Sequence, residues 1–212
     1  MKAFIFDMDG VIIDSQPIHF EVDALVLKEF GVDIDQKELE KYAGRANEDI
    51  WTDLKTKYNL KQAVPEIIEY LLSKKIQIFK ESKNGPIEGI IELIQKLDEA
   101  KIPMAVASSS PRALIETVME MFNIRDYFAY IISGDEVRKS KPEPDIYLTA
   151  ARKMNVEPKD CVVLEDTKNG VMAAKAAGMK CIGFHNPNSG DQDLSKADVI
   201  VESIRDVIQM IG

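Results

Sequence analysis

Two carboxylates lie two residues apart at the end of a short apolar run near the start of the chain. Asp7 and Asp9 follow the apolar residues 4–6 and precede Gly10. Side chains alternate along a strand, so both acids would begin on one face if the extended backbone continued, and Gly10 permits the chain to leave the strand. Two such carboxylates repel each other unless a cation lies between them. The pattern indicates a divalent-metal site with a carboxylate able to act as a nucleophile, although a strand that merely ends in acids would look the same.

Three serines and a lysine could bind an anion. Ser108, Ser109 and Ser110 precede Pro111 at the expected start of a helix, where hydroxyl groups, backbone N–H groups and the helix dipole favour a phosphate. N-capping by one serine is the simpler alternative. Lys141 lies in a proline-rich segment, where its ammonium could serve as a point charge for a phosphate and a carboxylate, or could be solvated like most loop lysines.

A second acidic pair, Glu165-Asp166, follows the apolar residues 161–164. With the first pair it could complete a site for Mg²⁺, which prefers oxygen ligands; alternatively, Glu165 caps the following helix or pairs with a nearby cation. A carboxylate nucleophile, a metal and a lysine suit phosphoryl transfer, because that reaction depends mainly on positioning and on neutralising charge. One aspartate would carry an aspartyl-phosphate, and the other would act as general acid and base.

The composition restricts the class of protein. The chain has 212 residues, of which 45% are hydrophobic and 30% charged, and a net charge of −9. This charge argues against nucleic acid or an anionic membrane as a partner, and no apolar run approaches the about 20 residues of a membrane helix. Cys161 and Cys181 lie in apolar segments and are interpreted as buried thiols of a reducing compartment, so a cytoplasmic location is expected. The sequence gives no indication of an oligomeric state.

The hydrophobic period changes along the chain and predicts two domains. Between residue 17 and about residue 81 the apolar residues have helical spacing. The first helical stretch begins at residue 17 and ends near Gly31, and further stretches follow at 36–42, 47–58 and 64–80. From residue 84 onward, apolar strands at 102–107, 130–133, 161–164, 180–184 and 199–201 alternate with helices near 87–100, 111–121, 144–154 and 168–177 and at the C-terminus. The pattern predicts an α/β fold, a Rossmann-like parallel sheet in a core of residues 1–15 and 82–212, with a four-helix insertion at 16–81. Ligands of such sheets bind at the carboxyl ends of the strands, where all the polar groups above would meet.

Four short motifs, in order across nearly the whole chain, resemble those of the haloacid dehalogenase superfamily. They are Asp7-Met8-Asp9-Gly10-Val11, Ser108-Ser109, Lys141-Pro142-Glu143-Pro144-Asp145, and Glu165-Asp166 followed by Asn169-Gly170. The combination is highly specific. The helical insertion after the first motif is similar to the small cap of the β-phosphoglucomutase-like subfamily.

The resemblance implies a role for each acidic residue. Asp7 would be the nucleophile and Asp9 the general acid and base. Mg²⁺ would be held by the Asp7 carboxylate, the Asp9 main-chain carbonyl and Asp166, with Glu165 in the same shell. The acid at position 9 argues against the dehalogenase and phosphonatase branches, which lack it.

The resemblance also implies how the phosphoryl group is bound. Ser108 and Lys141 would hold it, with Ser109 part of the same motif. The substrate would be a small phosphorylated metabolite, with sugar phosphates among the candidates.

The cap is where the chain departs from the mutases of the subfamily. His19 resembles a histidine that assists proton transfer, or is a partly exposed helix residue. In the segment around Gly44, Ala43 stands where the mutases have a lysine, and Asn47 stands where they have an arginine that grips a second phosphate. Arg45 could substitute, but its side chain would point differently.

A further departure follows the second motif, where Pro111-Arg112 replaces a Lys-Asn pair of the mutases. These differences favour a Mg²⁺-dependent phosphatase that transfers the phosphoryl group to water. A β-phosphoglucomutase is the alternative. A receiver-like phospho-aspartate signalling module is a remote alternative, disfavoured because such a module has no need of a helical cap.

Overall fold

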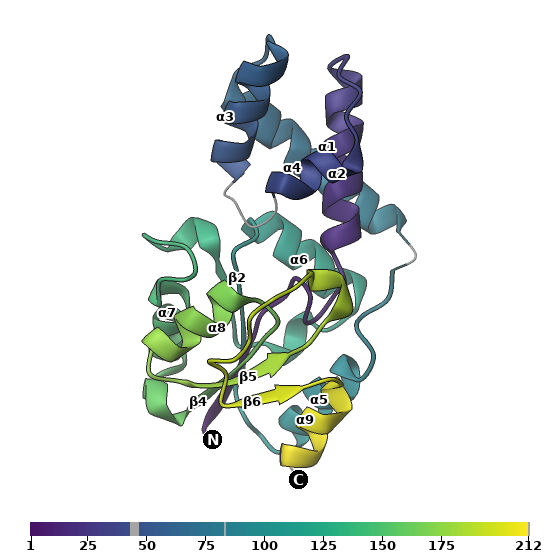
Figure 1. Ribbon diagram of the computed structural model, residues 1–212. Helices are drawn as coiled ribbons and strands as arrows, with labels where there is room; N and C mark the ends of the chain where they lie inside the picture. The colour runs from purple at the N-terminus through teal and green to yellow at the C-terminus, as the bar shows by residue number, and fades with distance from the viewer. Residues whose placement is uncertain (43–46, 83, 212) are drawn as a thin grey trace. The chain divides into compact units, whose positions relative to one another are not determined.

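A computed structural model describes residues 1–42, 47–82 and 84–211 of the chain (Figure 1). The chain divides into two compact units. One, here called the α/β unit, comprises Met1–Asp14 and Asn84–Gly212; the other, here called the helical unit, comprises Ser15–Lys83.

The α/β unit is built on a parallel sheet. Its six described strands lie in the order β3-β2-β1-β4-β5-β6, and every neighbouring pair is parallel. They are β1 (Ala3–Phe6), β2 (Met104–Ser108), β3 (Tyr130–Ser133), β4 (Cys161–Glu165), β5 (Lys180–Phe184) and β6 (Val199–Val201). Strands of this kind are continuous apolar runs because helices cover both of their faces. The predicted α/β fold with a parallel sheet is confirmed.

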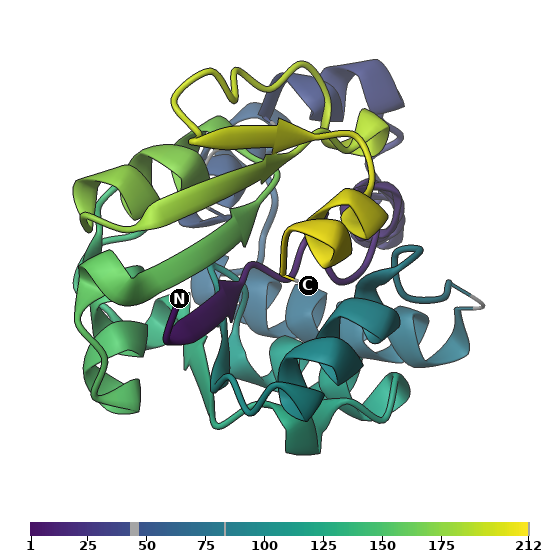
Figure 2. The same ribbon diagram turned by 90° about the horizontal axis from the view of Figure 1, so that it is seen from below.

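Helices lie on both faces of the sheet (Figure 2), and alternating side chains of β1 pack into the two layers. Ala3 and Ile5 lie in a buried cluster with α7 (Asp145–Met154) and α8 (Lys168–Ala176). On the opposite face, Phe6 packs edge-on against Phe128, with 5.6 Å between the ring centroids. The layer on that side includes α5 (Ile90–Glu99), α6 (Arg112–Met121) and α9 (Ile204–Ile211). The alternation decides which helices a residue at the end of β1 will meet.

Some element boundaries differ from the predicted ones for local reasons. The helix predicted over 87–100 begins at Ile90, because Gly89, with a φ of 86°, lies outside the helical region. The strand predicted over 102–107 extends from Met104 to Ser108, since Ser108 still pairs in register with Ser133 of β3.

The regular elements described in the helical unit are all helices. They are α1 (Gln16–Glu29), α2 (Gln36–Leu39), the 3₁₀ turn η1 (Glu40–Tyr42), α3 (Asn47–Tyr58) and α4 (Val64–Glu81). The apolar face of α4 packs on its neighbours through Ile67, Leu71 and Phe79, and Trp51 of α3 is fully buried. In the described part of the chain, no helix is both long enough and apolar enough to cross a membrane.

Candidate active site

Asp7 is the first residue after the central strand of the sheet. Its backbone N–H donates to the carbonyl of Leu164, 3.0 Å away, so the end of β1 is fixed against β4. Asp7 continues the series Ala3 and Ile5, whose side chains face α7. The residue is 5% exposed, and its carboxylate lies on the side of the sheet from which the loop before α7 approaches.

Lys141 of that loop joins the ends of three strands. Its Nζ lies 2.6 Å from Asp7 Oδ1 and 2.7 Å from Glu165 Oε1, and it donates to the carbonyl of Ala107 at 3.2 Å. The side chain is 7% exposed. Burial opposes its charge, but the carboxylates of Asp7 and Glu165 outweigh burial and raise the pKa of Lys141. The buried ammonium therefore stays charged beside the Asp7 carboxylate.

Glu165 is completely buried and is held by donors from the protein itself. Oε1 accepts from Lys141 and from the hydroxyl of Tyr147, 2.9 Å away. Oε2 accepts from the backbone N–H of Asp166 at 2.9 Å, and from the N–H and hydroxyl of Thr167 at 2.8 and 2.9 Å. Burial opposes ionisation, but Lys141 and Thr167 lower the pKa of Glu165 below its ordinary value. A carboxylate holds roughly four hydrogen-bond donors, so these five contacts occupy both oxygens.

Asp166 is equally buried but differs in its partners. Its Oδ2 accepts a hydrogen bond from the hydroxyl of Ser189, whereas Oδ1 is buried and has no hydrogen-bond partner among the described residues. Burial and the nearby charges of Glu165 and Asp7 raise the pKa of Asp166 well above its ordinary value. A buried polar atom with no partner is costly unless something else satisfies it.

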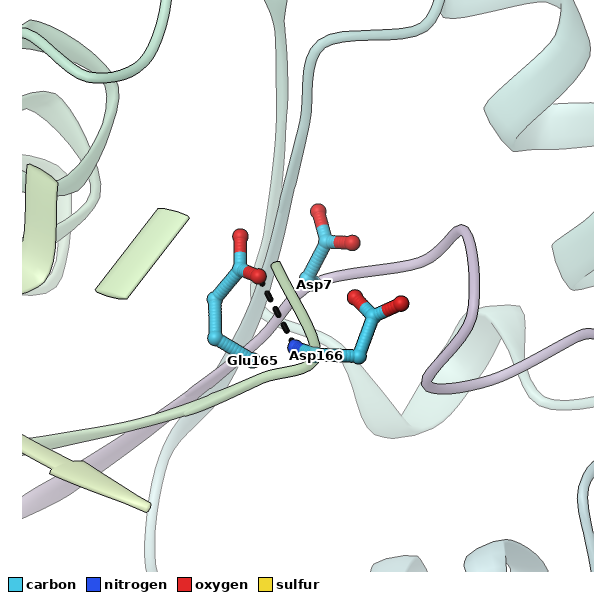
Figure 3. Close-up of side chains that lie close together, drawn as sticks. All are labelled: Asp7, Glu165 and Asp166. Carbon is cyan, nitrogen blue, oxygen red and sulfur yellow. Dashed lines mark hydrogen bonds between the residues drawn. The ribbon is translucent and has the colours of Figure 1, made fainter. Parts of the chain in front are cut away.

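Asp7, Glu165 and Asp166 form a compact acidic cluster, shown in Figure 3 at the ends of β1 and β4. One oxygen of each lies within 4.8 Å of the others. Burial raises the pKa of Asp7 to about 8, and the neighbouring carboxylates add to this effect while Lys141 opposes it. The single positive charge of Lys141 does not neutralise the negative charges that three carboxylates can carry. The unsatisfied Oδ1 of Asp166 and the all-oxygen donor set fit a hard divalent cation.

The side chain of Asp9 lies towards β2, the strand that neighbours β1 on the side opposite β4. The chain leaves β1 after Phe6 and turns at Gly10, whose φ is 81°. As a result, Asp9 Oδ2 accepts from the hydroxyls of Ser108 at 3.1 Å and Ser110 at 2.8 Å, both at the end of β2. The two aspartates therefore do not share one environment.

The segment after β2 is itself fixed by hydrogen bonds. Ser110 N–H donates to the Ser108 hydroxyl at 3.0 Å, and the Ser133 hydroxyl donates to the Ser110 carbonyl at 2.8 Å. Ser109 is exposed, and its carbonyl lies so close to Gly134 that a Cβ on that glycine would approach it to 2.6 Å. The structure thus brings the predicted core residues together at one edge of the sheet.

The residues expected in the cap belong to the helical unit. His19 lies on α1, half-buried, with its ring 5.9 Å from that of Phe79 between centroids. Asn47 is the exposed first residue of α3. Gly44 and Arg45 lie outside the described residues.

Sequence reasoning missed four residues that hold the site. They are Tyr147, Thr167, Asn186 and Ser189. Thr167 could have been found as an N-cap signal, since its hydroxyl accepts from Gly170 N–H at 3.1 Å at the start of α8. Asn186 and Ser189 follow β5, so the strand-end argument used for the other strands would have found them as well.

Comparison with known proteins places the chain in a family. The sequence model of the haloacid dehalogenase-like hydrolases matches residues 4–184. Hexitol phosphatase B of Escherichia coli (strain K12) is 33% identical over 210 residues, which cover 97% of this chain and 93% of that protein. The β-phosphoglucomutase of Bacillus subtilis (strain 168) is 30% identical over 213 residues, which cover 98% and 92%. The crystal structure of CbbY from Rhodobacter sphaeroides in complex with phosphate is 25% identical, with a TM-score of 0.86 and coverage of 98% and 96%.

These similarities confirm both the predicted superfamily and its β-phosphoglucomutase-like subfamily. The family match spans all four motifs, and two relatives at 30% identity or more align almost from end to end. The chain belongs to the haloacid dehalogenase-like hydrolase family.

Proposed function

We propose that this chain is a Mg²⁺-dependent phosphatase that hydrolyses a small sugar phosphate or sugar-alcohol phosphate through an aspartyl-phosphate on Asp7. One observation carries the proposal: the buried Asp7 carboxylate is paired at 2.6 Å with the ammonium of Lys141, beside Asp166, whose Oδ1 is unsatisfied among the described residues. Such a site offers a nucleophile and the charge needed to bring a phosphate dianion to it. Similarity to a hexitol phosphatase supports the class of substrate.

In the first step, an oxygen of Asp7 attacks phosphorus and the bond from phosphorus to the leaving oxygen breaks. Asp9 donates a proton to that oxygen, so the product leaves as an alcohol. In the second step, Asp9 takes a proton from water while the water oxygen attacks phosphorus, and the Asp7 carboxylate is restored as inorganic phosphate forms. Lys141 and Ser108 bind the transferring phosphoryl group through charge and hydrogen bonding.

Asp7 and Asp166, with the main-chain carbonyl of Asp9, would hold the Mg²⁺. When bound, the cation supplies positive charge that offsets the repulsion between the Asp7 carboxylate and the phosphate. Glu165 supports the site differently, because its oxygens already accept from Lys141, Tyr147, Asp166 and Thr167. We assign it to holding Lys141 and the backbone of Asp166 in place.

A β-phosphoglucomutase is the second candidate, favoured by the 30% identity to the Bacillus subtilis enzyme. A mutase must grip a second phosphate, and the sequence has Ala43 and Asn47 at the positions expected to do so. Arg112 does not replace them. Its Nε donates to Glu136 at 2.8 Å, Nη1 to Glu116 at 3.2 Å, and Nη2 to the carbonyl of Ile131 at 2.7 Å, all within the α/β unit. This engagement supports the phosphatase.

The test is a product analysis with Mg²⁺ and a panel of sugar and sugar-alcohol phosphates that includes β-glucose 1-phosphate. Release of inorganic phosphate from one or more members supports the phosphatase, and the Asp7→Asn variant should release none. Formation of glucose 6-phosphate from β-glucose 1-phosphate would instead identify a mutase. Stable phosphorylation of the protein without turnover would contradict both enzymes and support a signalling module.

A further inference from the structure

The segment that follows β5 reaches across the end of β4 to the loop that follows β1. Asn186 is 5% exposed, and its Nδ2 donates to the carbonyl of Gly10 at 3.0 Å. The Asn188 side chain donates to Asp14, and the Ser189 hydroxyl donates to Asp166. None of these three residues takes part in the proposed chemistry. Asn186 and Asn188 nevertheless contact the segment that carries Asp9, and Ser189 contacts Asp166.

Ser189 fixes one oxygen of Asp166 and leaves the other available. Oδ2 accepts from the Ser189 hydroxyl, while Oδ1 is buried without a partner in the described part of the chain. Hydrogen bonds of this kind orient a carboxylate before a cation arrives. Packing is tight as well, because a Cβ on Gly10 would collide with the Asp166 carboxylate and lie 2.8 Å from the Ser189 Oγ.

The position of Ser189 is in turn set by side-chain amides. Asn186 Oδ1 accepts from Asn188 N–H at 2.9 Å, which closes the turn that presents Ser189. Gln192 Nε2 donates to the Ser189 carbonyl at 2.9 Å, and Gln192 Oε1 accepts from Lys168 N–H, the first residue of α8, at 3.0 Å. The segment is therefore anchored to the loop after β1 and to the helix after β4.

We propose that Ser189 is a positioning residue for divalent-cation binding through Asp166, and that Asn186 holds Ser189 in place. The inference rests on the proposed function, because it takes Asp166 to be a ligand of the cation. Loss of the Ser189 hydroxyl leaves the Asp166 carboxylate free to rotate, so the cation binds more weakly while the chemistry at Asp7 is unchanged.

The experiment measures Mn²⁺ binding to the purified full chain by the electron paramagnetic resonance signal of free Mn²⁺. Substitution of residues that support metal ligands costs about 10–100-fold in affinity, so we expect Ser189→Ala to raise the dissociation constant for Mn²⁺ by that factor. Ser189→Thr keeps the hydroxyl and should retain the affinity. Ser195→Ala, an exposed serine of the same region, serves as the matched control and should bind Mn²⁺ like the unsubstituted chain.

Kinetics give a second readout. The Mg²⁺ concentration for half-maximal phosphate release should rise in Ser189→Ala, with the maximal rate retained. Asn186→Ala, which removes both the acceptor for Asn188 N–H and the donor to the Gly10 carbonyl, should also weaken Mn²⁺ binding. An unchanged Mn²⁺ dissociation constant in Asn186→Ala would show that Asn186 does not hold Ser189 in place.

Three results would overturn the inference. They are an unchanged Mn²⁺ dissociation constant in Ser189→Ala, equal weakening in Ser189→Ala and Ser189→Thr, and equal weakening in the Ser195→Ala control. In each case the unsubstituted chain still binds Mn²⁺ and releases phosphate, so the proposed function stands. An unsubstituted chain that binds no Mn²⁺ would overturn the proposed function together with the inference.

Discussion

Asp7 and Asp9 differ in everything that surrounds their carboxylates, although a single residue separates them. Asp7 is buried beside the ammonium of Lys141 and two further acids. Asp9 is half-buried and accepts from two hydroxyl groups at the end of β2. The ammonium of Lys141 opposes the effect of burial on Asp7 and so favours the ionised carboxylate that an attack requires, whereas hydroxyl donors can follow Asp9 as it gains and loses a proton. The different surroundings support different roles, a nucleophile and a general acid–base.

Asp7→Asn should abolish turnover and leave the fold intact, because an amide has the shape of the carboxylate but does not form the acyl phosphate. The measurement is inorganic phosphate released from the best substrate of the panel, with circular dichroism as the check on folding. Asp126→Asn, at an exposed aspartate of the α/β unit, is the matched control and should keep full activity. Appreciable turnover by Asp7→Asn would rule out the covalent route.

Asp9→Asn should slow hydrolysis by about 10²–10⁴-fold, the usual contribution of a general acid–base. The loss should be greatest for sugar phosphates, whose leaving alcohols need a proton. It should be smaller for p-nitrophenyl phosphate, whose leaving group departs as an anion. The measurement is the kcat/KM of the unsubstituted chain divided by that of the variant, determined separately for a sugar phosphate and for p-nitrophenyl phosphate. Equal losses on both substrates would mean that Asp9 does not protonate the leaving group.

At the scale of elements, the contact between the end of β4 and the start of α8 depends on a glycine. A Cβ on Gly170 would collide with the carboxyl group of Glu165, which has no room to move because its donors surround it. In most helices a Gly-to-Ala change stabilises the fold slightly. Here the close approach reverses that expectation.

Gly170→Ala should lower the free energy of unfolding by about 1–3 kcal/mol, the usual cost of overpacking a filled site. It should also reduce phosphate release, since Glu165 positions Lys141. Thermal unfolding and activity are measured beside Gly85→Ala, where a Cβ meets no atom within 4 Å. The Gly85 variant should be neutral or slightly stabilised. If both variants behaved alike, Gly170 would not be needed for the approach of Glu165.

The elements themselves are largely predictable because their signals are local. Continuous apolar runs predict the parallel strands, and the carboxyl-edge rule predicts from the sequence alone that Asp7, Lys141 and Asp166 lie close together. Contacts that cross the sheet edge are not local. The pairing of Ser189 with Asp166 depends on how far the segment after β5 folds back, and no periodicity encodes this. Similarly, the turn at Gly10 gives the two aspartates different partners, whereas strand alternation alone places them on one face.

At the scale of the whole molecule, the burial of two acids links the pH to the stability of the fold. The pKa of Asp7 is raised to about 8 and that of Asp166 well above its ordinary value, both chiefly by burial. In the unfolded chain the carboxyl groups of both aspartates titrate at about pH 4. Between about pH 5 and pH 8 the folded chain therefore binds more protons than the unfolded one, and the free energy of unfolding without a cation falls as the pH rises. Glu165, whose pKa is lowered, contributes the opposite slope only at more acidic pH.

If Mg²⁺ binds as proposed, it should reverse this trend, because it would replace the protons on Asp7 and Asp166 and bind only the folded state. The measurement is the difference in Tm between samples with EDTA and samples with saturating MgCl₂. The stabilisation by Mg²⁺ should be small at about pH 5 and larger at about pH 8. A Mg²⁺ concentration of 100 times the dissociation constant adds about 2.7 kcal/mol to the free energy of unfolding. Asp166→Asn, which removes one of the two titrating ligands, should lose most of the shift at both values. If the Tm shift were equal at the two pH values, or if it persisted in Asp166→Asn, the cation would bind elsewhere than at Asp7 and Asp166.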